Sequence, residues 1–369
     1  MQRGNASMTV TEHYRNLHRI PELAGTEFET AAYIEAALKA MGYTPVRVAE
    51  RGVYADLLSD PEAKWLLFRA DTDALAVEEK SAAPVCSCHP GIMHACGHDT
   101  HCAMLLAAAE ALFGQKLPYN IRFLFQPAEE TTEGAADVIA AGAMPKDLRA
   151  CFGLHVWQGT PLGSISSRPG AMMAASDIYK IRIRGRSAHC AKAAEGADAL
   201  RTAVEIAAAL PVLRAEAEDP RTVLFLGSIH AGKSHNVVSD AAELFGTLRT
   251  FSAEDRKNLK ARLRQHAEER AAANGTEAEI EWDIGCPVVY NDEEILHRLQ
   301  AAGVEILEVP PTLAGEDFAR YMEFAPGVML WLGTGDTPPI HSPGFYVPEE
   351  ALPVGVELWQ RIARMDWGA

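Results

Sequence analysis

The stretch KWLLFRAD, residues 64–71, decides the fold class, because it has the dense apolar pattern of a short buried strand and ends on an acid. Similar strands are expected at residues 119–126, YNIRFLFQ, and 149–157, RACFGLHVW. Helices are expected between them, at residues 100–114 and 134–142. This alternation predicts an α/β domain with a mostly parallel sheet covered by helices.

Polar residues lie at the ends of these predicted strands. Asp71 ends the first strand, Gln126 ends the second, and His155 lies near the end of the third. In open α/β sheets, ligands bind outside the carboxyl ends of the strands. These three side chains are therefore expected near one site.

The N-terminal region carries one strong helix signal. Within residues 25–42, Thr26 and Glu29 form an expected capping box, and Gly42 ends the helix. The first sixteen residues, MQRGNASMTVTEHYRN, lack an apolar signal core and are predicted to be a polar tail.

The sequence pattern changes near residue 173, where apolar and polar residues begin to alternate. The expected elements are a strand at 176–185, a helix at 197–217, strands at 222–232 and 242–251, a helix at 253–275 and a strand at 277–285. The order βαββαβ predicts a ferredoxin-like α+β domain. We therefore expect this domain, residues 173–285, to be inserted into a discontinuous domain formed by residues 1–172 and 286–369.

The composition excludes several classes of protein. The 369 residues are 48% hydrophobic and 23% charged, with a formal net charge of −16, which opposes a nucleic-acid-binding role. No apolar run reaches the roughly 18 residues that a membrane-spanning helix needs. The seven cysteines are an odd number, and no signal core precedes them, so we expect reduced thiols and a cytoplasmic location.

The stretch HACGHDTH, residues 94–101, is the first candidate metal site. Cys96 and His98 are two residues apart on a turn that leads into an apolar helix. A thiolate and an imidazole are good ligands for first-row metals. A buried cysteine beside a structural histidine is the alternative for this stretch alone.

The stretch QPAEET, residues 126–131, is the second candidate. Paired glutamates are common on solvated surfaces, but Glu129 and Glu130 follow a buried strand. One carboxylate could bind a metal while its neighbour stays available as a general base.

His155 and His341 complete the candidate ligands. Each could be structural, one at a strand end and the other in the Pro/Gly-rich loop PPIHSPGF. Together with Cys96, His98 and Glu130, however, they supply five N, O and S ligands. That set exceeds one tetrahedral zinc site and suits two metal ions sharing a bridging water.

Several motifs occur in one order along residues 13–360: LHRIPELAGTEFET, RADTDAL, MHACGHDTH, QPAEETTEGA, GLHVWQGTPLG, NVVSDAAELFGTLRTF, AGEDFARY and HSPGF. This combination resembles the amidohydrolase branch of the M20 metallopeptidase superfamily. That branch includes hippurate hydrolases, N-acyl-amino-acid amidohydrolases, N-acetyl-diaminopimelate deacetylases and auxin-conjugate hydrolases.

The resemblance implies roles for individual residues. The implied ligands of two divalent ions, Zn²⁺ or Mn²⁺ with Ni²⁺ or Co²⁺ as further options, are Cys96, His98, Glu130, His155 and His341. Glu129 matches the general base, and Asp73 matches a carboxylate that orients a ligand; Asp71 replaces a histidine of related peptidases. The insert matches a lid or dimerisation domain, where His189, Asn236 and Arg249 match substrate-contacting positions.

The implied activity is hydrolysis of the amide bond of N-acyl amino acids by a homodimer. A dipeptidase or aminopeptidase of the same superfamily is the alternative closest to it. A cysteine hydrolase with Cys96 as nucleophile, and His98 or His101 as base, leaves the glutamates unexplained. A zinc-stabilised binding protein would need no free base. The chain departs from the branch at HCAKAAEG, where a second lid histidine is absent.

Overall fold

The computed structural model describes residues 8–368, which form two compact units. The first contains the described residues up to Met172, Val289–Pro310 and the residues from Asp317 onward. The second contains Met173–Val288 and Pro311–Glu316. Residues 286–288 and 311–316, which the sequence places in the first domain, group with the second because Cys286 bridges to Ser176 and Thr312 to Met173.

An eight-stranded sheet forms the centre of the first unit, in the order β1-β2-β4-β3-β5-β14-β6-β13. Its middle strands are parallel: β4 (Asn120–Gln126), β3 (Trp65–Asp71), β5 (Leu148–Trp157) and β14 (Gly327–Gly333). The flanking strands are β1 (Val46–Val48), β2 (Gly52–Leu57), β6 (Ile165–Ser167) and β13 (Ile306–Glu308). Asp71 and Gln126 end neighbouring strands in register. The predicted mixed α/β fold with a mostly parallel central sheet is confirmed.

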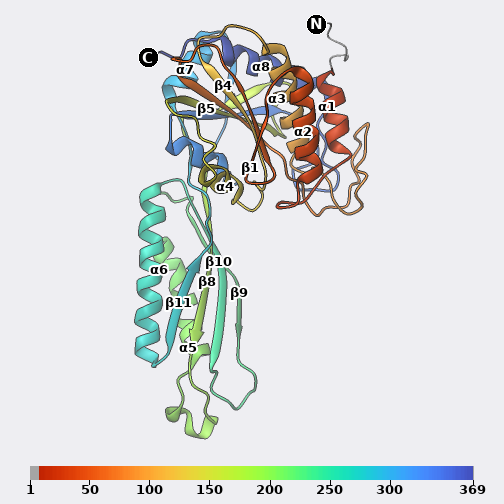
Figure 1. The fold of residues 1–369 in the computed structure, drawn as a ribbon. Helices are drawn as coiled ribbons and strands as arrows, with labels where there is room; N and C mark the ends of the chain where they lie inside the picture. The colour runs from red at the N-terminus through yellow and green to blue at the C-terminus, as the bar shows by residue number, and fades with distance from the viewer. Residues whose placement is uncertain (1–7, 369) are drawn as a thin grey trace. The chain divides into compact units, whose positions relative to one another are not determined.

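Helices cover this sheet (Figure 1). The apolar helix α3 (His98–Leu112) contacts the central strands, and α1 (Val10–His18), α2 (Phe28–Met41) and α8 (Leu352–Arg364) pack against it. Phe68 of β3 stacks on Trp359 of α8 with ring centroids 4.8 Å apart. The remaining elements of this unit are α4 (Gly134–Ala140), β7 (Gly170–Met173), β12 (Val289–Asn291), α7 (Glu293–Ala301), η2 (Asp317–Glu323) and η3 (Glu349–Ala351).

Two N-terminal predictions are wrong. Residues 10–16 belong to α1 and not to a polar tail, because Thr9 and Glu12 form a capping box; residues 1–7 lie outside the described part. The α2 cap is also different. The carboxylate of Glu22 accepts hydrogen bonds from the first N–H groups of α2, whereas Thr26 Oγ1 donates to a backbone carbonyl.

The second unit is a four-stranded antiparallel sheet with two helices. Its strands are β8 (Ala175–Arg184), β9 (Val223–Ala231), β10 (Ala241–Thr250) and β11 (Glu277–Trp282), in the order β11-β8-β10-β9. The helices α5 (Ala199–Arg214) and α6 (Ala253–Asn274) bury Leu210 and Leu263 in a core with Tyr179 and Ile181 of β8. Chain order and strand order are those of a ferredoxin-like unit.

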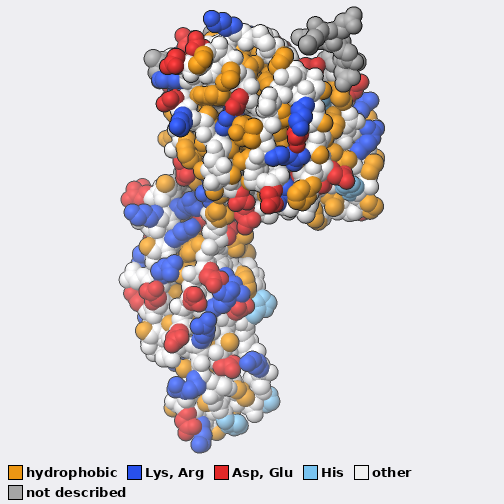
Figure 2. Space-filling view, in the orientation of Figure 1, with side chains coloured by type: hydrophobic (Ala, Val, Ile, Leu, Met, Phe, Trp, Pro, Cys, Tyr) orange, Lys and Arg blue, Asp and Glu red, His pale blue; other side chains and the backbone are white. Residues whose placement is uncertain are grey.

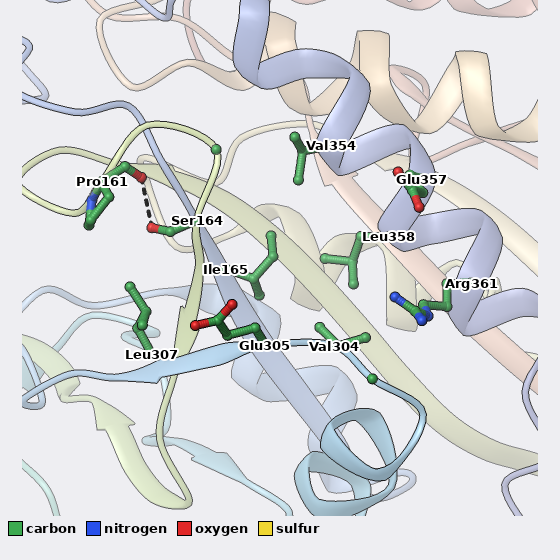
Figure 3. A pocket seen from close by; sticks show the side chains of 12 residues that line it. Pro161, Ser164, Ile165, Val304, Glu305, Leu307, Val354, Glu357, Leu358 and Arg361 are labelled. Atoms are coloured by element: carbon green, nitrogen blue, oxygen red, sulfur yellow. Dashed lines mark hydrogen bonds between the residues drawn. The ribbon is translucent and has the colours of Figure 1, made fainter.

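The surface adds little information about function. On the face drawn in Figure 2, acidic and basic side chains are interspersed. Within residues 8–368, no helix combines the length and apolar character needed to cross a membrane. A cavity of about 460 Å³ lies beside α8, lined by Val304, Leu358 and Arg361 among others (Figure 3). No predicted site residue lines it.

Candidate metal centre

A tight turn places Cys96 and His98 at the start of α3. Gly97 between them has φ +84, and a Cβ at this position would lie 2.4 Å from Val156 Cγ2. Only glycine fits here, because L residues rarely adopt this backbone region and no space exists for a side chain. The turn therefore fixes the thiol and the imidazole close together.

The structure brings all five predicted ligands into one cluster. Candidate ligand atoms of Cys96, His98 and Glu130 lie within 4.8 Å of one another. Cys96 Sγ is 3.4 Å from His155 Nε2 and 3.3 Å from His341 Nε2. The same His341 nitrogen is 3.3 Å from Glu130 Oε1. These elements are far apart in sequence, so the fold assembles the cluster.

Hydrogen bonds orient two of the imidazoles. His98 Nδ1–H donates to Asp73 Oδ1 at 3.2 Å, and His155 Nδ1–H donates to the Val156 carbonyl at 2.6 Å. Both rings thereby direct Nε2 toward the cluster, which is the orientation typical of metal-binding histidines.

Two buried atoms of the cluster lack a hydrogen-bond partner. They are His98 Nε2 and Glu130 Oε1, which lie 4.0 Å apart. Buried polar atoms are rarely left without a hydrogen bond, and a cation between this nitrogen and this carboxylate oxygen would satisfy both. The residues therefore fit a divalent metal.

The electrostatics of the cluster agree with this fit. Burial, together with Glu130, Glu129 and Asp71, raises the pKa of the Cys96 thiol well above its usual range. Burial and the nearby His101 lower the pKa of His155. Burial alone would lower the pKa of His98, but Asp71 and Asp73 raise it to about 10. The pocket thus has an excess of negative potential that favours a cation.

His341 is the most exposed predicted ligand, with 51% of its side chain accessible. It has φ +63, an uncommon conformation for a residue with a side chain. Its backbone N–H donates to the Ala95 carbonyl at 2.7 Å, directly before Cys96. Strained backbone of this kind often holds a ligand in place.

The glutamate pair lies in a tightly wound turn after β4. Ala128 and Thr132 both have positive φ, at +55 and +60. A Cβ on Gly134 would lie 1.7 Å from the Pro127 carbonyl oxygen, so the turn closes only with glycine there. The Glu130 N–H donates to Asp73 Oδ2 at 2.9 Å, which ties the turn to the metal cluster. Glu129 is 8% exposed and belongs to the same turn.

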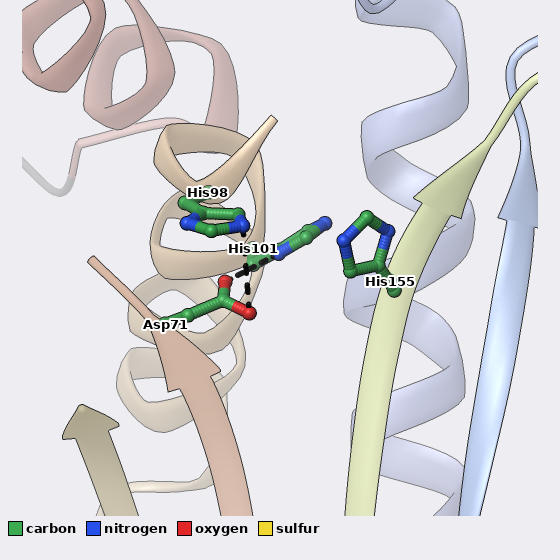
Figure 4. A group of neighbouring side chains, drawn as sticks. All are labelled: Asp71, His98, His101 and His155. Carbon is green, nitrogen blue, oxygen red and sulfur yellow. Dashed lines mark hydrogen bonds and ion pairs between the residues drawn. The ribbon is translucent and has the colours of Figure 1, made fainter. Parts of the chain in front are cut away.

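The sequence offers His101 only as the base of a cysteine hydrolase, and it predicts Asp71 near the site without a named contact. Both lie beside His98 and His155 in Figure 4. His101 Nδ1–H donates to Asp71 Oδ1 at 2.6 Å, and His101 Nε2 accepts the Val156 N–H at 2.9 Å. Both ring nitrogens are therefore used, so His101 supports the cluster and does not ligate. Its spacing of three from His98 on a helix was the available signal.

The other predicted substrate residues belong to the second unit. His189 is the N-cap of η1 (Cys190–Glu195), and its backbone bridges to Val237, next to Asn236. Arg249 pairs with Ser176 at the opposite end of β8 and β10. The fold thus brings His189 and Asn236 together but separates them from Arg249.

The fold and the cluster define a two-unit α/β protein with a candidate dinuclear metal centre. The sequence model that defines peptidase family M20/M25/M40 matches residues 67–365 of this chain. The chain therefore belongs to this family.

Known proteins that resemble the chain agree with this assignment. It is 38% identical over 347 residues to the N-acetyl-L-cysteine deacetylase of Bacillus subtilis (strain 168), covering 92% of this chain and 83% of the relative. It is 34% identical to the N-acetyldiaminopimelate deacetylase of Streptococcus suis (strain 05ZYH33), covering 95% and 97%. A solved structure, the YXEP protein of Bacillus subtilis, described as a dinuclear metal binding peptidase from the M20 family, superimposes with a TM-score of 0.83 at 34% identity, covering 96% of both chains.

Proposed function

We propose that this protein is a metal-dependent amidohydrolase that cleaves N-acyl amino acids into a carboxylic acid and a free amino acid. The observation that carries the proposal is the buried pair His98 Nε2 and Glu130 Oε1, which lie 4.0 Å apart without a hydrogen bond and beside the buried Glu129. Relatives named as deacetylases of N-acetylcysteine and N-acetyldiaminopimelate support the substrate class.

Two divalent ions complete the proposed centre, held by Cys96, His98, Glu130, His155 and His341. Bound there, they would supply Lewis acidity toward the acyl carbonyl and lower the pKa of water. Zn²⁺ or Mn²⁺ suits this mixed set of thiolate, imidazole and carboxylate ligands, with Ni²⁺ or Co²⁺ as alternatives. Asp73 holds the Nδ1–H of His98 and the N–H of Glu130, which keeps both ligands oriented.

Glu129 is the proposed general base. It takes a proton from the attacking water and then delivers that proton to the departing amine nitrogen. His189 is proposed to donate to the carbonyl oxygen as negative charge develops on it. Arg249 is proposed to pair with the substrate α-carboxylate, and Asn236 to add a polar contact.

The cysteine-hydrolase alternative is disfavoured by the surroundings of Cys96. The raised pKa keeps its thiol protonated, whereas a nucleophilic cysteine needs a lowered pKa. The dipeptidase alternative uses the same centre and differs only in the acyl group accepted.

A homodimer is also proposed. The second unit of a single chain cannot bring both His189 and Arg249 to one small substrate, because the two residues lie too far apart. Arg249 pairs with Ser176 and Ala241 pairs with Arg184, eight residues further along the sheet, which is about 27 Å at ~3.4 Å per residue. His189 lies beyond the far end, next to Asn236. We propose that a second copy of the chain supplies His189 and Asn236 to the site.

Subunit complementation tests this arrangement. Glu129→Gln and His189→Ala chains, each of very low activity alone, are mixed and allowed to exchange subunits. If His189 acts in the partner's site, each mixed dimer regains one complete site and activity returns. No recovery in confirmed mixed dimers would place His189 in its own chain's site.

A cytoplasmic location is proposed on the state of the thiols. The seven cysteines, all of which lie within residues 8–368, form no disulfide with one another. Reduced cysteines are typical of cytoplasmic proteins.

The reaction is tested on metal-stripped protein restored with Zn²⁺ or Mn²⁺. The substrates are N-acetyl, N-benzoyl and indoleacetyl amino acids, N-acetylcysteine, N-acetyldiaminopimelate and several dipeptides. Metal-dependent release of an amino acid from an N-acyl substrate is expected, with Glu129→Gln as the inactive control. Cleavage of dipeptides alone would favour the peptidase alternative, and no cleavage by a fully metallated protein would contradict the proposed substrate class.

A further inference from the structure

One buried carboxylate near the centre has no role in the mechanism above. Glu27 precedes α2 and is fully buried, at 0% exposure. It occupies the N-cap position but makes no capping hydrogen bond. Glu22 satisfies the first N–H groups of α2 instead, which leaves the Glu27 side chain available for another contact. Burying an ionised carboxylate destabilises the folded protein unless the carboxylate is paired. The partners of Glu27 therefore indicate which contact the fold keeps it for.

The Glu27 carboxylate reaches the turn that carries the glutamate pair. Glu27 Oε1 accepts the backbone N–H of Ala128 at 2.8 Å, and Glu27 Oε2 lies 3.3 Å from Arg51 Nε. Ala128 immediately precedes Glu129. The contact therefore joins α2 to the backbone directly before the proposed base.

Ala128 is held in a conformation that it does not favour. Its φ of +55 is in the left-handed region, which is unfavourable for an alanine because its Cβ crowds the following carbonyl oxygen. The Ala128 carbonyl accepts the Gly134 N–H at 3.1 Å and Thr131 Oγ1–H at 3.2 Å. The strained residue thus closes the turn, and a charge-assisted hydrogen bond from outside the turn stabilises it.

The two glutamates are held differently. The N–H of Glu130, the proposed ligand, has its own acceptor in Asp73 Oδ2. Loss of the Glu27 contact would therefore disturb Glu129 more than Glu130. A displacement of about 1 Å at a reacting group can lower a rate about 100-fold.

We propose that Glu27 is a positioning residue that fixes the Ala128 backbone and thereby sets Glu129 for proton transfer. The proposal rests on the function proposed above, because it assigns Glu129 as the base. Glu27 itself touches neither the substrate nor the metal.

Two substitutions remove the contact and one preserves it. Glu27→Leu removes the acceptor, and Glu27→Asp keeps the charge beside Arg51 but withdraws the carboxylate from Ala128. Both are expected to lower kcat about 10- to 100-fold with KM and bound metal nearly unchanged. Glu27→Gln keeps an acceptor oxygen and is expected to stay within a few-fold of wild type. Glu29→Leu, in the exposed first turn of the same helix, is the matched control.

Hydrogen exchange of the peptide covering residues 126–134 tests the geometry independently of activity. Glu27→Leu and Glu27→Asp should accelerate exchange at the Ala128 amide, and Glu27→Gln should not. The absorption of Co²⁺-loaded protein should stay unchanged in all three, because the ligands keep their places. If Glu27→Leu does not fold, the exchange rate of the Ala128 amide in Glu27→Asp tests the proposal instead.

The outcomes separate this proposal from the proposed reaction. Faster exchange with a loss of kcat that glutamine rescues supports the positioning role. Unchanged exchange at Ala128 in a folded Glu27→Asp protein overturns it, whatever the activity. If wild-type protein cleaves no N-acyl amino acid, the proposed function fails, and exchange alone still decides whether Glu27 holds the turn.

Discussion

The proposed metal cluster of the first unit and the proposed substrate residues of the second unit are built in opposite ways. Cys96 and His98 are buried at the start of α3 and His155 is buried in β5, and they are fixed by hydrogen bonds or by a glycine turn. His189 is exposed and Asn236 is half-buried, and both lie on connections between strands. Burial with assigned partners gives pre-organised ligands, whereas exposed side chains become ordered only when a substrate or partner covers them.

The difference indicates how catalysis and specificity are divided. The proposed metal cluster would perform the same chemistry for any acyl amide, so its residues should control kcat and metal content. Asn236 and Arg249 should control which acyl amino acid binds, and therefore KM, whereas the proposed contact of His189 with the developing negative charge should affect kcat. Three predictions test this division, from the largest expected effect to the smallest, and a fourth tests the stability of the first unit.

Glu129→Gln should reduce kcat by about 1000-fold or more, because general acid–base catalysis typically contributes 10²–10⁴-fold. Bound metal should remain at the wild-type level, measured by elemental analysis beside steady-state kinetics. Glu133→Gln, an exposed acid of the same turn, is the matched control and should behave as wild type. Wild-type turnover by Glu129→Gln would remove Glu129 from the mechanism.

Cys96→Ser should weaken metal binding by at least about 100-fold, since even outer-sphere partners of metal ligands contribute 10–100-fold. Competition with a chelator gives the dissociation constants. Binding should also weaken at acid pH in the wild type, because the raised pKa of Cys96 means that metal must displace a proton. Exposed Cys88→Ser is the control. Equal affinities for Cys96→Ser and wild type would rule out the thiol as a ligand.

Arg249→Ala should raise KM about 10- to 100-fold, which is the value of a hydrogen bond to a charged group, and change kcat less. An N-acyl amino acid amide, which lacks the α-carboxylate, should show no such difference between variant and wild type. Arg184→Ala, on an exposed end of the same sheet, provides the comparison. A large loss of kcat with little change in KM would instead show that Arg249 acts in the hydrolytic step and not in substrate binding.

The smallest effect concerns the stability of the first unit. His18 lies between Asp99 and Glu79, at 2.6 and 3.1 Å. Burial opposes its charge, but these carboxylates raise its pKa to about 10. Below the unfolded pKa of about 6.5 the stabilisation is complete. Between pH 6.5 and 10 only the folded state keeps the proton, so stability should fall by up to ~1.4 kcal/mol per pH unit.

Urea unfolding at pH 7 and pH 9 measures this dependence. His18→Gln should remove most of it, even though the variant starts less stable. An identical pH slope in both proteins would show that another group titrates.

The sequence predicted the parts of the molecule that depend on local pattern. Dense apolar runs such as residues 64–71 correctly predicted the central strands. The alternation of apolar and polar residues from residue 176 correctly predicted the first strand of the ferredoxin-like unit. The five ligand residues could be proposed because cysteine, histidine and glutamate next to strand ends are a small set, and the structure brings them together.

What the sequence missed depends on contacts between distant segments. The cap of α2 comes from Glu22, six residues before Phe28, and no capping pattern contains that spacing. The pairing of Glu27 with Ala128 joins residues 101 apart. The use of both nitrogens of His101 depends on the register between α3 and β5.

The central claim is that bound metal in the Cys96 cluster hydrolyses N-acyl amino acids. The most direct test titrates metal-free protein with Mn²⁺ or Zn²⁺ while amine release from an N-acetyl amino acid is followed. Activity should rise from zero and reach a plateau at about two equivalents, as expected for a dinuclear centre. Full activity in the metal-free protein, unchanged by chelator or added metal, would contradict the account.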